Sequence, residues 1–119
     1  MSKPKVLIVD DDQHLRMLYQ AELEDENYEV FIASSGKEAL EFFEKQTPDI
    51  VTLDILMPGM DGIEVLRRMK EKKPGLPVIM STAYDYRDDF SVWASDAYVV
   101  KSADLTELKS TIKTLLAKK

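Results

Sequence analysis

Short apolar runs alternate with segments of helical spacing along the whole chain, and this alternation constrains the fold more than any other feature. The runs that we predict to be strands are Lys5–Val9, Tyr28–Ala33, Ile50–Leu53, Val78–Ser81 and Ala97–Val100. All but the second are continuously apolar, which is typical of parallel strands that are covered on both faces. Strict alternation of strand and helix implies right-handed crossovers. The pattern therefore predicts an α/β domain, a doubly wound five-stranded parallel sheet with helices on both faces.

Apolar spacing and capping residues place the helices between these runs. We expect one helix over Gln13–Glu26, one after Ser34 or Ser35, one after Asp61 and Gly62, and one after Asp104. Asp104 is a good N-cap, and Glu107 follows three residues later as in a capping box. The polar and aromatic segment between Thr82 and Ala97 has no clean helical stripe. We expect at most a short fourth helix there, around Asp88–Ala94.

Length, charge and composition exclude several classes of protein. The 119 residues suit a single domain over residues 1–119. There is no cysteine, which excludes disulfides, thiolate metal sites and a cysteine nucleophile, and fits a reducing, cytoplasmic location. The net charge is −6 and no basic patch stands out, so we expect no direct nucleic acid binding. No signal peptide is evident, and the apolar stretches are too short for a membrane span.

Polar residues of a matching set follow four of the predicted strands. Asp10 and Asp11 follow the first strand, Asp54 the third, Thr82 the fourth and Lys101 the fifth. The carboxyl ends of parallel strands meet at one edge of a sheet, where open α/β folds bind their ligands. We therefore expect three carboxylates, a hydroxyl and an ammonium to lie in one crevice.

This set of groups favours a divalent cation and a phosphoryl group. Clustered carboxylates repel one another, and Mg²⁺ removes that repulsion while taking its remaining ligands from water and phosphate. An ammonium and a hydroxyl opposite the metal are well placed to bind phosphate oxygens. Phosphoryl transfer to a carboxylate, with an aspartyl phosphate as product, suits all the parts.

In these motifs the chain resembles the receiver domain of two-component response regulators. The matching segments are Val6–Asp12, Leu53–Gly62, Thr82–Ala83 and Tyr98–Lys101. The second contains Asp-x-x-Met-Pro-x-Met-Asp-Gly, which is highly specific when it stands in order with the others. The resemblance covers essentially the whole chain and implies a flavodoxin-like sheet with strand order 2-1-3-4-5.

The resemblance also implies how the metal is bound. Asp54 would accept a phosphoryl group from the phosphohistidine of a partner, in a reaction that depends on Mg²⁺, for which Mn²⁺ can substitute. Asp11 and Asp54 would bind the metal directly, together with the backbone carbonyl of Leu56. Asp10 would act mostly through a metal-bound water.

By the same resemblance, Lys101 and Thr82 would contact the phosphoryl oxygens. Thr82 and Tyr98 would form the switch pair that moves when the domain is phosphorylated. The surface around the short fourth helix, the fifth strand and the last helix would then change for a downstream protein target. The phosphoryl donor would be a histidine kinase or a histidine phosphotransfer protein.

The chain departs from the usual receiver pattern in two ways. Ser102 stands where receivers have proline, and the segment between Thr82 and Lys101 is shorter than usual, so the output surface is atypical. A trans peptide is expected between Lys101 and Ser102, because a cis bond before serine is costly.

One alternative to a phosphorylated receiver is a pseudo-receiver that binds a partner without phosphorylation. The other is a phosphohydrolase of the haloacid-dehalogenase type, which would need an acid where Leu56 stands. We expect a phosphorylatable switch and not an enzyme, with His14 in a surface role.

Overall fold

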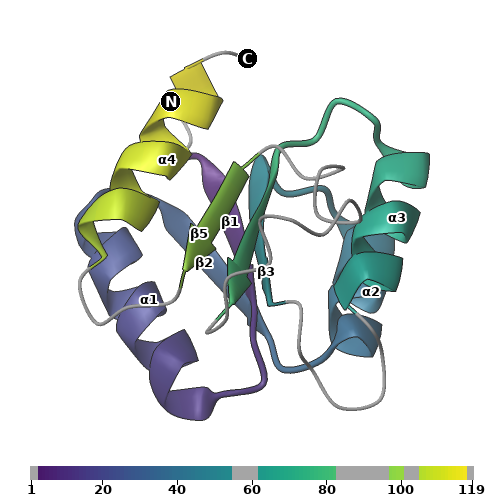
Figure 1. Ribbon diagram of the computed structural model, residues 1–119, viewed down its shortest axis with the longest axis horizontal. Helices are drawn as coiled ribbons and strands as arrows, with labels where there is room; N and C mark the ends of the chain where they lie inside the picture. The colour runs from purple at the N-terminus through teal and green to yellow at the C-terminus, as the bar shows by residue number, and fades with distance from the viewer. Residues whose placement is uncertain (1–2, 55–61, 83–96, 101–104, 118–119) are drawn as a thin grey trace.

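The computed structural model describes residues 3–54, 62–82, 97–100 and 105–117, which form one sheet between two layers of helices (Figure 1). The expected short helix at 88–94 and the Lys101–Ser102 peptide lie outside the described residues. The elements are, in chain order, β1 (Lys5–Val9), α1 (Gln13–Asp25), β2 (Glu29–Ala33), α2 (Gly36–Lys45), β3 (Ile50–Asp54), α3 (Gly62–Lys72), β4 (Val78–Thr82), β5 (Ala97–Val100) and α4 (Thr106–Ala117).

The sheet has the predicted topology. Its strands lie in the order β2-β1-β3-β4-β5, and every neighbouring pair is parallel. Helices α1 and α4 cover one face, and α2 and α3 cover the other (Figure 1). The doubly wound flavodoxin-like fold expected from the sequence is therefore confirmed. Among the helices that the structure describes, none has the length and apolar character that a bilayer crossing requires.

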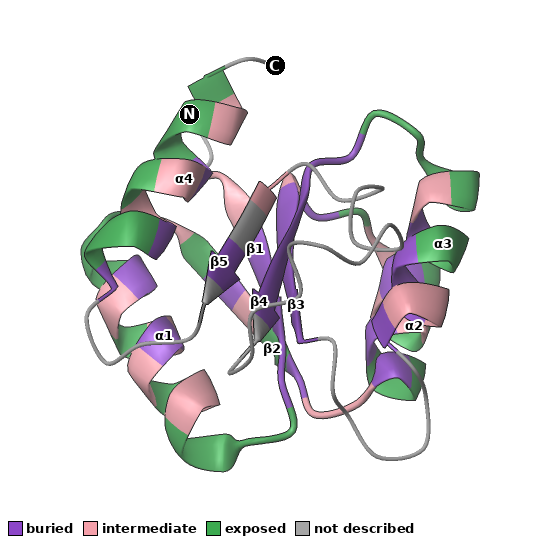
Figure 2. Cartoon of the chain, viewed as in Figure 1, coloured by how far each residue is buried: buried purple, intermediate pink, exposed green. Residues whose placement is uncertain are grey.

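The core consists of two apolar clusters, one on each face of the sheet (Figure 2). Side chains alternate between them along each strand, as the period of two requires. In β1, Leu7 and Val9 belong to the cluster under α2 and α3, whereas Val6 and Ile8 belong to the one under α1 and α4. This alternation also decides which face each residue at the carboxyl end of a strand lies on.

The predicted boundaries hold to within one residue, and the differences have local causes. Helix α1 ends at Asp25 because Asn27 adopts a left-handed conformation with φ of 72°. The Tyr28 N–H then donates to the Leu23 carbonyl, so β2 begins at Glu29. Helix α4 begins at Thr106, and the carbonyl of the preceding Leu105 accepts the bond from Lys109 N–H.

Two serines directly before helix α2 form hydrogen bonds with Glu38 in its first turn. Ser35 is the N-cap, and its hydroxyl accepts a hydrogen bond from the Glu38 N–H at 3.1 Å. The Glu38 carboxylate in turn accepts bonds from the N–H and hydroxyl of Ser34. These bonds, the backbone one first, lower the pKa of Glu38 below its usual value. The arrangement is a capping box shifted by one residue, which satisfies one orphan donor of the helix, the Glu38 N–H, and ties the preceding Ser34 to the first turn.

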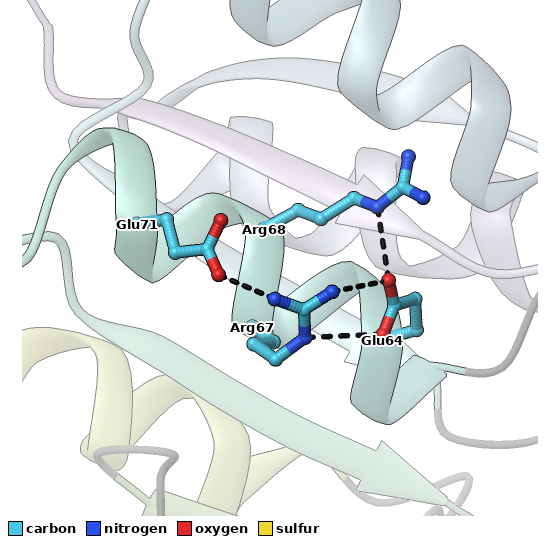
Figure 3. Close-up of polar contacts among 4 residues, drawn as sticks. All are labelled: Glu64, Arg67, Arg68 and Glu71. Atoms are coloured by element: carbon cyan, nitrogen blue, oxygen red, sulfur yellow. Dashed lines mark hydrogen bonds and ion pairs between the residues drawn. The ribbon is translucent and has the colours of Figure 1, made fainter.

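The outward face of α3 carries an ion-pair network (Figure 3). Arg67 bridges Glu64 and Glu71, and Arg68 contacts the same Glu64 at 3.1 Å. Hydrogen bonds from Arg67 and then Arg68 lower the pKa of the Glu64 carboxyl. Since these side chains are exposed and lie one helical turn apart, the pairs add little to stability and keep this face polar. The adjacent Arg67 and Arg68 are therefore partly neutralised by acids of their own helix.

We predict that Ser35→Ala lowers the free energy of unfolding by about 1 kcal/mol, because the Glu38 N–H loses its capping acceptor. Urea unfolding followed by circular dichroism measures the change. Ser110→Ala, at an exposed position inside α4, is the matched control and should stay within about 0.5 kcal/mol of the wild type. Equal stability of Ser35→Ala and the wild type would contradict the capping role.

Candidate functional site

Three carboxylates meet at the carboxyl ends of β1 and β3. Asp10 directly follows β1, Asp11 comes next, and Asp54 is the last residue of β3. The register pairs Val9 with Leu53, so the acids stand one residue further along two neighbouring strands. One oxygen from each of the three carboxylates lies within 4.8 Å of the others. This is the point where the connections from β1 and β3 diverge to opposite faces, the usual ligand site of such sheets.

The consecutive acids after β1 have different roles. Asp12 is the N-cap of α1, and its carboxylate accepts hydrogen bonds from the N–H groups of His14 at 2.9 Å and Leu15 at 3.3 Å. Asp10 is buried and accepts from the Asp12 N–H at 2.9 Å. Asp11 is exposed. Capping therefore accounts for Asp12, and Asp10 and Asp11 belong to the carboxylate cluster.

Burial makes this cluster unusual among acidic groups. Asp10 is 2% exposed and Asp54 3% exposed, a degree of burial that is rare for acidic side chains. Two buried carboxylates beside an exposed third form a set of oxygen donors that opens to solvent at Asp11. A hard divalent cation of the Mg²⁺ type prefers carboxylate oxygens and keeps several waters. The residues present fit such an ion.

For the other predicted site residues, the structure describes the backbone of Thr82 and Tyr98 but not Leu56 or Lys101. Thr82 is the last residue of β4, at the same edge of the sheet as Asp54, and Tyr98 lies in β5 opposite Met80. The side chains of Thr82 and Tyr98, and the whole of Leu56 and Lys101, lie outside the described residues. Their functional contacts therefore remain predictions. His14 is exposed, as expected for a surface role.

Two residues near the carboxylates were missed in the sequence. The Arg16 guanidinium donates a hydrogen bond to the Asp10 backbone carbonyl at 2.7 Å, which ties the first turn of α1 to the end of β1. Ser81 pairs with Asp54 across β3 and β4 and is buried. Its only signal in the sequence is a polar residue at the end of an otherwise apolar run, which by itself indicates no more than the end of a strand.

Comparison with known proteins gives a consistent result. The sequence model of the response regulator receiver domain family matches residues 6–113. Sporulation initiation phosphotransferase F of Bacillus subtilis is 37% identical over 119 residues, covering 98% of this chain and 96% of the relative. The alkaline phosphatase synthesis transcriptional regulatory protein PhoP of the same organism is 36% identical over 94% of this chain, which spans only 48% of that relative's length.

Solved structures agree with the sequence relatives. The response regulator TrrA of Thermotoga maritima, in complex with Mg²⁺–BeF, superposes with a TM-score of 0.91 and 45% identity, covering 94% of this chain and 98% of TrrA. In a complex with the histidine kinase ThkA, TrrA gives a TM-score of 0.90 and 46% identity over 95% and 98% of the two chains. A CheY-like receiver domain from Methanospirillum hungatei reaches 0.93 at 32% identity, covering 98% of this chain and 96% of its own.

We predict that Asp11→Asn stabilises the metal-free protein, because it removes one of three negative charges within 4.8 Å of one another. Relief of a partly screened repulsion at this distance is worth on the order of 1 kcal/mol, and added salt should reduce the gain. Urea unfolding in EDTA at low and high salt measures it. Asp25→Asn, an exposed acid at the end of α1, is the control and should change stability less. A destabilised Asp11→Asn protein would refute mutual repulsion.

Proposed function

Because this chain belongs to the family of response regulator receiver domains of two-component signalling, we propose that Asp54 is its phosphoacceptor. The observation that carries the proposal is the position of Asp54 at the end of the central strand, within 4.8 Å of Asp10 and Asp11. Among the acids of the cluster, Asp54 alone stands at the end of β3, and the other two face it from β1. That asymmetry distinguishes the proposed acceptor on β3 from the two acids that follow β1, which would take part only in metal binding.

The proposed reaction is a direct phosphoryl transfer. A carboxylate oxygen of Asp54 attacks the phosphorus of a partner's phosphohistidine and forms a new P–O bond. The P–N bond breaks, its electron pair stays on the imidazole nitrogen, and that nitrogen takes up a proton. The chain contributes chiefly the position and orientation of its acceptor, as is usual for phosphoryl transfer.

Asp11, Asp54 and the backbone carbonyl of Leu56 would hold a Mg²⁺ ion, with Asp10 acting through a water. Mn²⁺ is proposed to substitute, since it has the same preference for oxygen donors. When bound, such an ion neutralises charge on the phosphoryl oxygens and on the clustered carboxylates. The complex of TrrA with Mg²⁺–BeF supports this assignment.

Lys101 and Thr82 are proposed to bind the phosphoryl oxygens, and Thr82 and Tyr98 to form the switch pair. In support, Thr82 is the last residue of β4, next to Ser81, which pairs with Asp54, and Lys101 follows β5 in the chain. A lysine supplies a compact positive charge on a long stem. Movement of the pair would alter the surface formed by β5 and α4 and by the segment that precedes β5.

We further propose that the chain acts as a switch and not as an enzyme with a separate substrate. The complex of TrrA with the histidine kinase ThkA supports a histidine kinase as the donor, and the relative named as a phosphotransferase supports a histidine phosphotransfer protein as a second type of partner. A downstream protein target and a cytoplasmic location complete the proposal. The absence of cysteine fits a reducing compartment.

We predict that incubation with Mg²⁺ and a small phosphodonor adds one phosphoryl group to the wild type and none to Asp54→Asn. The amide keeps the shape of the carboxylate but is not a nucleophile. Intact-mass analysis measures the addition. Asp25→Asn is the control and should be labelled as the wild type is. Labelling of Asp54→Asn at the wild-type level would refute the assignment, and an unlabelled wild type would favour the phosphorylation-independent binding module.

We predict that Mg²⁺ raises the free energy of unfolding by about 2.7 kcal/mol at roughly a hundredfold excess over its dissociation constant, because it binds only the folded state. Urea unfolding with Mg²⁺ and with EDTA measures the gain. Asp11→Asn should lose most of it, since a directly bound carboxylate is missing, and Asp25→Asn should keep it. Equal gains in both variants would exclude Asp11 as a ligand.

A further inference from the structure

Ser81 carries a buried hydroxyl that nothing in the described structure uses. Among the residues that the structure describes, its Oγ is the one buried side-chain nitrogen or oxygen without a hydrogen-bond partner. The residue is 3% exposed. An unpaired hydroxyl in a buried position is unfavourable, and native structures keep few of them. This one therefore calls for a physical reason.

The register of the sheet places Ser81 beside the phosphoacceptor. Ser81 of β4 pairs with Asp54 of β3 on one side and with Val99 of β5 on the other. Ile79 and Val99 belong to the cluster under α1 and α4, and Met80 to the opposite one, so alternation puts Ser81 on the α1 and α4 face.

Asp54 lies on the same face as Ser81. Ile50 belongs to the cluster under α1 and α4, whereas Val51 and Leu53 belong to the opposite one. Counting in steps of two from Ile50 therefore brings Asp54 to the face of Ser81. Neighbouring strands are about 4.8 Å apart, so a hydroxyl and a carboxylate on one face at one register position can reach each other by side-chain rotation alone.

Packing alone does not account for the serine. The residues before it in β4 are apolar and fully buried: Val78, Ile79 and Met80. An alanine would fit the same space and avoid the unpaired hydroxyl. A hydroxyl is useful at this position only if it gains a partner in another state of the site.

We propose that Ser81 is a positioning residue for Asp54, whose hydroxyl donates a hydrogen bond to the Asp54 carboxylate when a divalent cation is bound. A carboxylate has two oxygens, and a donor on the neighbouring strand fixes its rotation, so that one oxygen is kept for the cation and the other for the phosphorus. Hydrogen bonds to an ionised acceptor are about twice as strong as neutral ones. This role rests on the function proposed above.

The experiment compares Ser81→Ala, Ser81→Thr and the wild type in three measurements. These are the urea unfolding midpoint in EDTA, the Mg²⁺ dissociation constant by calorimetry without phosphodonor, and the rate of Asp54 labelling by a small phosphodonor. Thr52→Val, which removes a buried hydroxyl two residues before Asp54 on the same strand, is the matched control. Threonine keeps the hydroxyl of Ser81 and suits a strand.

Ser81→Ala should keep or raise the unfolding midpoint in EDTA, because it removes an unpaired polar group. The same variant should bind Mg²⁺ about tenfold more weakly and be labelled correspondingly more slowly, the loss expected for one hydrogen bond to a charged group. Ser81→Thr should restore both values to within about twofold of the wild type. Thr52→Val should leave the Mg²⁺ dissociation constant within about twofold whatever it does to the midpoint.

An unchanged Mg²⁺ dissociation constant and labelling rate in Ser81→Ala, beside a wild type that binds Mg²⁺ and is labelled, would overturn the role of Ser81 alone. The function proposed for Asp54 would then stand. A wild type that neither binds Mg²⁺ nor is labelled would overturn the proposed function and the role of Ser81 with it. Loss of Mg²⁺ affinity in Ser81→Thr equal to that in Ser81→Ala would also overturn the role, since the hydroxyl would then not be the group that matters.

Discussion

The parallel pairing of β1 with β3 is the constraint on which the rest of the structure depends. The pairing of Val9 with Leu53 brings Asp10 and Asp54 to one edge of the sheet. The two strands are buried on both faces, so a slip of one residue would turn apolar side chains out of both clusters. Because core packing forbids that slip, the distance between the two acids is set by the whole sheet and not by the loops around them.

The site places charged side chains at positions that the fold buries. Two carboxylates at 2% and 3% exposure stand where the core would otherwise continue, and they face a third within 4.8 Å. Two contacts stabilise the chain where it leaves β1: Asp12 caps α1, and Arg16 ties that helix to the Asp10 backbone carbonyl. Repulsion that remains without a ligand favours ligand binding, since anything that neutralises the cluster stabilises the native state.

Charges on the outer helices behave differently from the charges at the sheet edge. The network of Glu64, Arg67, Arg68 and Glu71 on α3 is exposed and neutralised within one helix (Figure 3). Such pairs are screened by solvent and contribute little. The carboxylates of the site come from two strands separated by α1, β2 and α2 in the chain, and two of them are buried. Charged groups of the same kind therefore affect stability little on the exposed face of α3 and more at the sheet edge, where two of them are buried.

The sequence by itself determined the strands and the strand–helix alternation, because hydrophobic periodicity is a local property of a chain. The parallel sheet that this alternation implies then placed Asp10, Asp11 and Asp54 at one edge. Only the tertiary structure showed what the third acid of the run does, since Asp12 caps α1 although it is chemically identical to Asp10 and Asp11. It also placed the unpaired hydroxyl of Ser81 beside Asp54. Their position as neighbours depends on strand order and register, which arise from pairing between residues far apart in the chain.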